Sequence, residues 1–311
     1  MKISVTSPSF SKNEILVKEL KNSFDNVKLN TKGIRFDKEQ LIEYLKDSDG
    51  VIVGLEKIDK EVLDNLPKLK YISKYGVGLN NIDLDECKKR GIKIGWKGGV
   101  NKVSVAEMTL GYMLMLMRNL FVSSNRLKKG IWEKNGGFQL TGKTIGIIGV
   151  GYIGKEVVRL LKPFNCLILV NDIINQDKYY KENNLIETSK EEIYKKADII
   201  TIHTPLDKTT ENLITLKEFQ MMKNSAYVIN SARGGIINED DLKYALQNNL
   251  ITGAAIDAYI QEPPSDMELL SLENLICTPH IAGNAYEAVL AMGKSAIENL
   301  KFIIKNGESL I

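Results

Sequence analysis

The chain has 311 residues and a mass of 34.9 kDa, which is more than one compact domain ordinarily needs and favours two domains. Hydrophobic residues make up 43% and charged residues 26%, a balance that excludes a disordered chain. A net charge of +3, from 42 basic and 39 acidic residues, is too even for a dedicated nucleic-acid-binding protein.

Cysteine and histidine usage limits the chemistry further. Cys87, Cys166 and Cys277 lie far apart without CxxC spacing, and His203 and His280 are the only histidines. We therefore expect no metal site, and we expect reduced thiols in a cytoplasmic protein. The N-terminal sequence lacks the long apolar stretch of a signal peptide, and glycine and arginine interrupt the most apolar region, so we expect no membrane partner.

The N-terminal third of the chain alternates short apolar runs with helical patterns. Strands are predicted at 3–5, 50–53, 70–74 and 92–95, and helices near 12–24 and 83–90. This order is typical of βαβ units, in which a parallel sheet carries helices on both faces.

Two flexible breaks divide the chain. Gly98-Gly99 precede a long methionine-rich helical pattern, and Ala282-Gly283-Asn284 precede a predicted terminal helix. Between the breaks, a second βα series begins at Thr144. We predict two Rossmann-like or flavodoxin-like α/β domains with a cleft between them, one domain of residues 99–283 being inserted into another made of residues 1–98 and 284–311.

A glycine-rich turn opens the second series. A strand-like run at 144–148 leads into Gly149-Val150-Gly151-Tyr152-Ile153-Gly154, and a helical pattern follows. In a dinucleotide-binding turn the first glycine makes the turn, the second lets the backbone approach a pyrophosphate, and the third allows close packing of the helix. The N-terminus of that helix then offers N–H groups to the phosphate charge.

The residues that end the next strand indicate which dinucleotide is bound. Asp172 lies 18 residues beyond Gly154, where a carboxylate can accept hydrogen bonds from a ribose diol and repels a 2′-phosphate. Because Ile173 and Ile174 follow instead of Arg or Lys, the sequence predicts NAD rather than NADP. A methyltransferase that binds S-adenosylmethionine can carry the same strand–turn–helix arrangement. The remaining residues of the site are therefore needed to tell the two classes of protein apart.

Three later segments, 230–235, 257–264 and 278–283, place polar residues directly after predicted strands. Loops after parallel strands line one edge of a sheet, so Arg233, Glu262 and His280 can converge there. Imidazole titrates near neutral pH, which makes His280 the natural base for the proton that a secondary alcohol loses when it is oxidised by hydride transfer. Glu262 would stabilise the imidazolium and orient the ring, and Arg233 would hold a substrate carboxylate through two hydrogen bonds.

These motifs resemble those of the D-2-hydroxyacid dehydrogenase family, and the resemblance covers almost the whole chain. It rests on GVGYIG at 149–154, NSARGG at 230–235, DAYIQEPP at 257–264 and TPHIAG at 278–283. Residues 74–83 and 105–107 also resemble the substrate-domain signature and the interdomain helix of that family. Within it, the chain is most similar to short D-3-phosphoglycerate dehydrogenases without a regulatory domain.

The resemblance implies an NAD-dependent oxidoreductase that acts on the CH–OH group of a D-2-hydroxy acid and forms a homodimer through its NAD-binding domain. It assigns catalysis to Arg233, Glu262 and His280, and contact with the nicotinamide carboxamide to Asp257. His203 is expected to lie in a cofactor loop and not to be catalytic. The cofactor contacts implied are Val77, Gly149, Gly151, Tyr152, Ile153, Gly154, Asp172, Thr204, Pro205, Ser231, Ala232, Arg233, Asp257, His280, Ala282 and Gly283.

The leading substrate prediction is 3-phosphoglycerate, oxidised to 3-phosphohydroxypyruvate in serine biosynthesis. Lys74 is the most plausible cation for a phosphate, with Lys97 and Lys102 as further candidates, and backbone N–H groups around Gly76, Val77 and Gly78 could hold a carboxylate. However, Gly54-Leu55-Glu56 stands where many phosphoglycerate dehydrogenases carry an Arg-Ser pair, which removes one phosphate ligand. The predicted substrate-binding residues are Lys74, Gly76, Val77, Gly78, Arg233 and His280.

Two alternatives stay open at this point. A glycerate-type enzyme that reduces hydroxypyruvate or glyoxylate would use the same catalytic residues. A dinucleotide-sensing, corepressor-like binding protein shares the fold and similar residues, so the motifs do not separate it from an enzyme. Formate dehydrogenases carry a different residue pair around the catalytic histidine, and that pair is not evident here.

Overall fold

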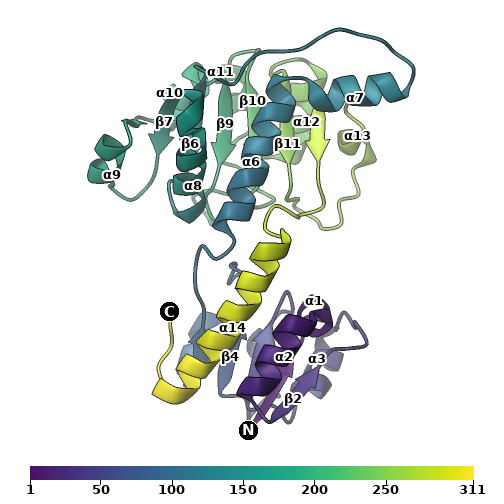
Figure 1. The fold of residues 1–311 in the computed structure, drawn as a ribbon, viewed down its shortest axis with the longest axis vertical. Helices are drawn as coiled ribbons and strands as arrows, with labels where there is room; N and C mark the ends of the chain where they lie inside the picture. The colour runs from purple at the N-terminus through teal and green to yellow at the C-terminus, as the bar shows by residue number, and fades with distance from the viewer. The chain divides into compact units, whose positions relative to one another are not determined.

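The computed structural model describes residues 1–311 as two compact α/β units, shown in Figure 1. The first unit comprises Met1–Asn101 and Asn284–Ile311, and the second comprises Lys102–Gly283. The chain leaves the first unit after Asn101 and not at residue 98, because Val100 still packs against the apolar core of that unit.

The first unit is built on a five-stranded parallel sheet in the order β2-β1-β3-β4-β5. Apolar residues alternate between its two faces: Ile52 packs on one side, and its neighbours Val51 and Val53 on the other. The strands are β1 (Lys2–Val5), β2 (Asn26–Leu29), β3 (Gly50–Val53), β4 (Tyr71–Lys74) and β5 (Lys93–Gly95).

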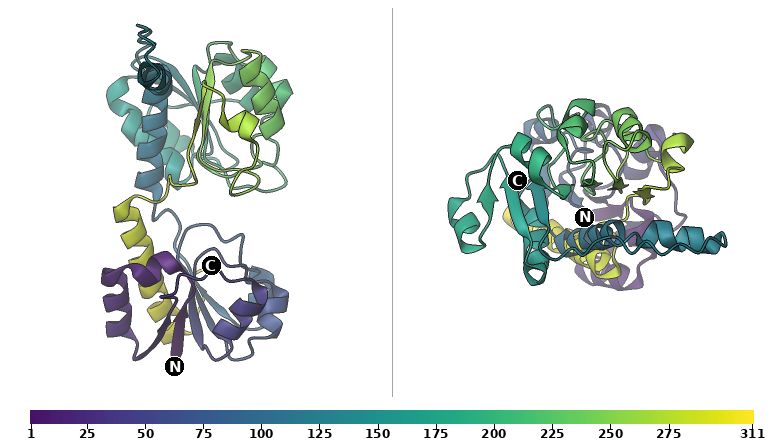
Figure 2. Two further views of the ribbon diagram at one scale, coloured as in Figure 1. Left: turned by 90° about the vertical axis from the view of Figure 1, so that its right-hand side faces the viewer. Right: turned by 90° about the horizontal axis from the view of Figure 1, so that it is seen from above.

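Helices cover both faces of this sheet, as the left view of Figure 2 shows for the unit taken by itself. The terminal helix joins the face covered by the first two helices, so distant parts of the sequence share one core. One face carries α1 (Pro8–Lys12), α2 (Glu14–Ser23) and α14 (Tyr286–Asn306), and the other carries α3 (Lys38–Leu45), α4 (Lys60–Asp64) and α5 (Leu84–Lys89).

The second unit is built on a seven-stranded parallel sheet in the order β12-β11-β10-β9-β6-β7-β8. The first strand of this sheet in the sequence is β6, and the chain adds β7 and β8 outward on one side of it. The chain then crosses to β9 on the other side, so the strand order reverses beside β6. The strands are β6 (Thr144–Ile148), β7 (Leu167–Asn171), β8 (Ile186–Glu187), β9 (Ile199–Ile202), β10 (Tyr227–Asn230), β11 (Gly253–Ile256) and β12 (Leu275–Cys277).

Both faces of the second sheet are also covered by helices, which makes two apolar cores. One face carries α6 (Lys102–Met117), α8 (Tyr152–Leu161) and α9 (Asp177–Glu182), with the short 3-10 turn η1 (Lys162–Phe164) after α8. The other carries α10 (Lys190–Lys196), α11 (Leu216–Met221), α12 (Glu239–Gln247) and α13 (Met267–Leu270). The predicted fold class, two parallel-sheet α/β domains, is therefore confirmed.

An arm of residues 118–139 extends from the end of α6 in the second unit (Figure 1). It contains α7 (Leu120–Lys128), which buries no residue, and a loop that returns to α6 where Phe138 N–H donates to Met117 O at 2.7 Å. Ion pairs from Arg126 to Glu133 and to Glu273 hold the arm in place. Its large apolar side chains are exposed: Leu120, Leu127, Ile131, Trp132 and Phe138.

No single helix of the chain is both long and apolar enough to cross a membrane, although α6 and α7 pass that test jointly as a bent pair. No group of three or more His, Cys, Asp or Glu side chains is arranged to hold a metal ion.

Candidate active site

The glycine-rich turn lies between β6 and α8, at the point where the strand order reverses. Gly149 has φ 94°, and a Cβ on Gly154 would lie 2.2 Å from the carbonyl oxygen of Gly149, so the fold itself requires these two glycines. Around Gly151 the situation differs, because no atom lies within 4 Å of the position that a Cβ would take. Gly151 is also the N-cap of α8, and no side chain caps that helix. An open helix N-terminus of this kind fits a pyrophosphate.

Asp172 is fixed at the end of β7 and tied to the same turn. Its Oδ2 accepts the N–H of Val150 at 2.6 Å, and its Oδ1 accepts the N–H of Ile174 at 2.9 Å. The side chain of Gln176 donates to the carbonyl oxygen of Val150 at 3.2 Å. A carboxylate oxygen has more than one acceptor position, so Asp172 can receive ribose hydroxyls as well as these amides.

The loop after β9 lies against the glycine-rich turn, since a Cβ on Gly149 would lie 2.7 Å from the carbonyl carbon of His203. Burial lowers the pKa of His203 to about 3, which keeps its ring neutral, and its Nε2 lies 3.0 Å from Oγ1 of Thr201. The Nδ1 of His203 and the Oγ1 of Thr204 are both enclosed without a hydrogen-bond partner. A neutral, enclosed imidazole is unsuited to proton transfer, whereas an unsatisfied hydroxyl beside the turn fits a polar ligand such as a dinucleotide.

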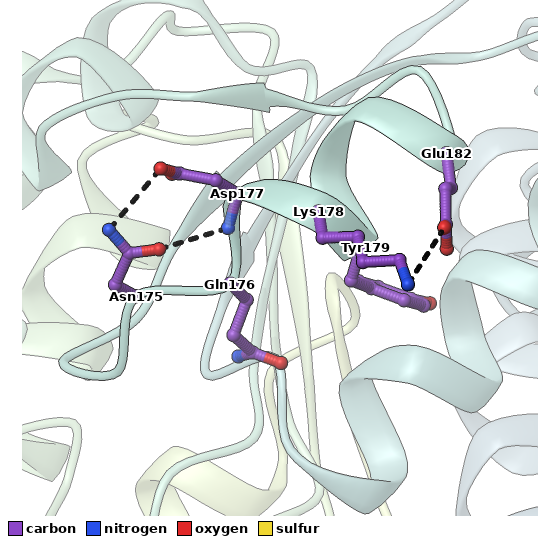
Figure 3. A pocket seen from close by; sticks show the side chains of 6 residues that line it. All are labelled: Asn175, Gln176, Asp177, Lys178, Tyr179 and Glu182. Carbon is purple, nitrogen blue, oxygen red and sulfur yellow. Dashed lines mark hydrogen bonds and ion pairs between the residues drawn. The ribbon is translucent and has the colours of Figure 1, made fainter.

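A surface hollow of about 380 Å³ lies beside α9 (Figure 3). Its polar side chains bond mainly to one another: Asn175 pairs with Asp177, and Lys178 with Glu182. The hollow contains none of the predicted site residues, so it is not the candidate active site. Its lining residues are Asn175, Gln176, Asp177, Lys178, Tyr179 and Glu182.

The three loops predicted to carry catalysis follow β10, β11 and β12, which are neighbours in the sheet. Backbone hydrogen bonds join their first residues, from Asp257 N–H to Asn230 O at 3.0 Å and from Thr278 N–H to Ile256 O at 3.1 Å. A Cβ on Gly234 would lie only 1.9 Å from the carbonyl carbon of Tyr259. Only glycine therefore lets the Arg233 loop lie this close to the Glu262 loop.

His280 and Glu262 form a direct hydrogen-bonded pair. The Nδ1 of His280 lies 2.7 Å from Oε1 and 2.9 Å from Oε2 of Glu262, and Oε1 also accepts the N–H of Tyr259 at 3.2 Å. A proton on Nδ1 is the arrangement that bonds to a carboxylate, so Glu262 selects the tautomer of the ring. About two fifths of each of these two side chains is exposed, which keeps the pair accessible to a small molecule.

The backbone of His280 adopts φ 52°, the left-handed conformation that a non-glycine residue adopts at a cost of about 1–3 kcal/mol. Asp257 holds this turn: its Oδ1 accepts the N–H of Ile281 at 2.9 Å, and its Oδ2 accepts the N–H of Ala282 at 2.8 Å. Asp257 is fully buried. Its carboxylate therefore has a definite structural partner, while its contact with a nicotinamide carboxamide stays a prediction.

Arg233 lies in the same neighbourhood as the pair. Burial lowers the pKa of the Arg233 guanidinium, and the negative charge of Glu262 acts in the opposite direction. The guanidinium donates to Ala232 O at 2.7 Å through Nη1. Since arginine stays charged in proteins, the structure brings a cation, a histidine and a carboxylate to the ends of adjacent strands.

The remaining predicted residues, Lys74 and the 76–78 loop, belong to the first unit. Lys74 is buried, and its Nζ donates to Gly54 O at 2.5 Å and to Asn81 Oδ1 at 2.6 Å. Glu56 turns inward, where its Oε2 accepts the hydroxyl of Thr6 at 2.6 Å and the N–H of Gly54 at 3.1 Å. Asn81, which the motif analysis did not single out, thus takes part of the hydrogen-bonding capacity of Lys74.

Sequence reasoning also missed three hydroxyl groups of α6 that contact the loops of the site. Ser104 Oγ donates to Ala282 O at 2.6 Å, Thr109 Oγ1 lies 3.1 Å from Oγ of Ser231, and Tyr112 Oη bonds to Oγ1 of Thr278. The only signal for them in the sequence is their presence in a helix otherwise rich in methionine and leucine.

Comparison with known proteins decides the family. Residues 110–282 match the model of the NAD-binding domain of D-isomer-specific 2-hydroxyacid dehydrogenases. The chain belongs to this family. The match confirms the predicted resemblance, the oxidoreductase class and a nicotinamide dinucleotide as cofactor, and it excludes the methyltransferase.

The curated members of the 2-hydroxyacid dehydrogenase family that resemble the chain carry different names. D-3-phosphoglycerate dehydrogenase of Methanocaldococcus jannaschii is 37% identical over 86% of the chain and 52% of its own length, so the chain spans about half of that relative. Glyoxylate reductase of Thermofilum pendens is 37% identical over 86% of the chain and 82% of its own length. Among solved structures, D-lactate dehydrogenase from Aquifex aeolicus, complexed with NAD and lactic acid, aligns with a TM-score of 0.84 and 26% identity over 98% of the chain and 96% of its own.

Proposed function

We propose that this protein transfers a hydride between a D-2-hydroxy acid and NAD. The observation that supports the proposal is the His280–Glu262 pair beside Arg233, at the ends of three adjacent strands in a domain of this family. When bound, the dinucleotide supplies the hydride acceptor for oxidation or the hydride donor for reduction. The protein itself has to bind the acid, orient it and move one proton.

His280 is the proposed proton carrier. With Nδ1 held by Glu262, its Nε2 removes the proton of the substrate hydroxyl as the hydride leaves the same carbon, and the substrate becomes a 2-keto acid. In reduction the imidazolium returns that proton to the carbonyl oxygen. While the ring carries the proton, the charge of Glu262 stabilises the imidazolium. Arg233 binds the substrate carboxylate through its guanidinium and polarises the reacting oxygen.

We further propose NAD rather than NADP. Two backbone amides hold Asp172 at the end of β7. A carboxylate at this point of a dinucleotide-binding fold accepts ribose hydroxyls and repels a 2′-phosphate, which supports the proposal. Ile173, the next residue, is 95% exposed and offers no cation to such a phosphate. The other proposed cofactor contacts are Ser231, Ala232, Ala282 and Gly283, with Asp257 and Val77 as the proposed contacts of the nicotinamide.

For the substrate, the geometry of the first unit favours an unphosphorylated 2-keto acid, glyoxylate or hydroxypyruvate, over 3-phosphohydroxypyruvate. Lys74, the predicted phosphate ligand, is buried and bonded to Gly54 and Asn81, and Glu56 adds a negative charge to the same network. The amides of the 76–78 loop stay the proposed carboxylate ligands. A place in serine biosynthesis follows only if the phosphorylated acid is the substrate.

The test follows NADH absorbance with glyoxylate, hydroxypyruvate and 3-phosphohydroxypyruvate side by side. We expect rapid oxidation of NADH with at least one of the two unphosphorylated acids and a lower kcat/KM with the phosphorylated one. A preference for the phosphorylated acid would overturn the substrate assignment and return 3-phosphoglycerate to first place. Tight NADH binding with no turnover of any 2-keto acid would overturn the enzymatic proposal and favour a dinucleotide-sensing binding protein.

We also propose a homodimer formed through the NAD-binding domain, with the arm as part of the interface. The helix α7 buries no residue of its own, yet the arm exposes half or more of Leu120, Leu127, Ile131, Trp132 and Phe138. Apolar side chains gathered on one ordered segment are typical of a surface that a second copy covers. Light scattering should give twice the chain mass, and Trp132→Glu should shift it toward the monomer; a wild-type monomer would contradict the proposal.

The proposed compartment is the cytoplasm. All three cysteines are unpaired, and burial raises the pKa of the Cys87 thiol to about 12. A buried, protonated thiol such as that of Cys87 is oxidised slowly, and unpaired cysteines are typical of a reducing compartment. Alkylation of protein taken directly from cells, followed by mass spectrometry, should find three reduced cysteines, and a disulfide would contradict the assignment.

A further inference from the structure

The turn that carries His280 depends on a chain of buried polar groups. The N–H of His280 donates to Thr278 O at 3.0 Å, and the N–H groups of the two following residues donate to Asp257, as described above. Asp257 is fully buried, so its oxygens are shielded from water. This one buried carboxylate therefore holds two of the amides that shape the backbone just after His280.

The carboxylate is held in turn by two hydroxyl groups in series. Thr278 Oγ1 donates to Asp257 Oδ1 at 2.5 Å, and Tyr112 Oη is hydrogen-bonded to the same Oγ1. A threonine hydroxyl has a single proton, which is already given to the carboxylate. The proton of the second bond must therefore come from Tyr112, so the series runs from Tyr112 through Thr278 to Asp257.

Tyr112 belongs to α6, an element separate from the loops of the site, and only 2% of it is exposed. A second α6 hydroxyl, Ser104, donates to Ala282 O at 2.6 Å, on the other side of His280 in the sequence. From the β11 loop, Tyr259 Oη donates to Thr278 O at 3.0 Å while its N–H donates to Glu262. The helix thus contacts the His280 turn both before and after the histidine.

We propose that Tyr112 is a positioning residue for His280, acting through Thr278 and Asp257. Its hydroxyl donates to Thr278 Oγ1 and anchors that hydroxyl in the position from which it donates to Asp257, which in turn holds the His280 turn. When the series is complete, the left-handed backbone of His280 keeps the imidazole on Glu262. Tyr112 touches neither substrate nor cofactor in this role, and the inference rests on the proposed catalytic role of His280.

Loss of the Tyr112 hydroxyl should therefore lower turnover more than it weakens binding of the keto acid. In Tyr112→Phe the ring still fills its apolar site, but Thr278 Oγ1 loses the hydrogen bond that anchors it, so its position against Asp257 is no longer fixed. The fraction of molecules with a correctly placed imidazole falls, and we expect kcat to fall about tenfold. The KM for the keto acid should stay within about twofold, because Arg233 and the 76–78 loop are unchanged. The Kd for NADH should rise only as far as Asp257, a predicted nicotinamide contact, shifts.

The experiment compares wild type, Tyr112→Phe, Thr278→Val, Thr278→Ser, Tyr194→Phe and His280→Ala in steady-state NADH oxidation and in NADH fluorescence titration. Tyr194 is the matched control, because its buried hydroxyl bonds to a carbonyl oxygen, that of Leu213, in the same unit. Thr278→Val should share the loss of kcat, and Thr278→Ser, which keeps the hydroxyl, should recover most of it.

The outcomes separate this inference from the proposed function. The positioning role is overturned if Tyr112→Phe keeps wild-type kcat, or if it loses no more kcat than Tyr194→Phe does. The proposed function is still intact in that case, provided that His280→Ala is inactive. Equal losses in Thr278→Ser and Thr278→Val also overturn it. If His280→Ala keeps wild-type turnover, the proposed function fails first, and the role of Tyr112 falls with it.

Discussion

The Nδ1 atom of His280 lies 2.7 Å and 2.9 Å from the two carboxylate oxygens of Glu262, although the residues are 18 positions apart and follow different strands. The pair needs three features of the fold: adjacent parallel strands, a left-handed turn at His280, and a glycine at 234 that lets the loops approach. Each feature can be tested separately.

Replacing His280 with alanine should remove the proton carrier and leave the cofactor site intact. We expect kcat to fall about 10²–10⁴-fold, the usual contribution of a positioned general acid–base. The dissociation constant of NADH, measured by fluorescence, should stay close to wild type. Turnover equal to that of wild type would contradict the assignment of His280.

Replacing Asp172 with alanine should weaken NAD binding and reduce the discrimination against NADP. The change removes the proposed acceptor for the ribose diol and also the charge that repels a 2′-phosphate. Titration of both cofactors against both proteins measures the effect, with Asp177→Ala as a control on the exposed surface. If wild type already binds NADP as tightly as NAD, the choice of NAD is wrong.

Replacing Gly234 with alanine should damage both stability and activity. A Cβ there would lie 1.9 Å from the carbonyl carbon of Tyr259, so the Arg233 and Glu262 loops must separate. Overpacking of this kind costs about 1–3 kcal/mol of unfolding free energy. Gly111→Ala is the control, because Gly111 lies in α6 with no atom within 4 Å of the Cβ position. A Gly234 variant with unchanged Tm and kcat would show that the loops need no such contact.

His203 should make the protein less stable in acid. Burial lowers its pKa from 6.5 to about 3 in the folded state, so between these values the unfolded chain binds more protons than the folded one. Stability from this group is fully present above pH 6.5 and falls as the pH falls, by up to about 1.4 kcal/mol per pH unit. Urea unfolding of wild type and His203→Asn at pH 7 and pH 5 measures the effect. Equal acid losses in both proteins would rule out this contribution.

Local patterns predicted the parts of the molecule that depend on neighbours in sequence. The strands at 50–53 and 144–148 have the predicted bounds, because short continuous apolar runs mark buried parallel strands. The convergence of Arg233, Glu262 and His280 followed from the rule that loops after parallel strands share one edge.

Contacts between distant side chains were not predictable in this way. Tyr112 and Thr278 are 166 positions apart, and a tyrosine in an apolar helix reads as a core residue. The partners of Lys74 were missed for a similar reason: Asn81 is close in sequence, but the direction of its side chain depends on the path of the loop. These two partners of Lys74 are the reason why the proposed substrate is an unphosphorylated acid.

The placement of α14 has a consequence for protein synthesis. Ile297, Leu300 and Ile303 of this helix belong to the same core as Ile3 and Leu16, and a Cβ on Gly293 would lie 2.2 Å from a methyl group of Leu16. The ribosome finishes the whole second unit before this helix appears. The N-terminal segment must therefore wait with an uncovered apolar face, and the unit that is translated second is able to fold first.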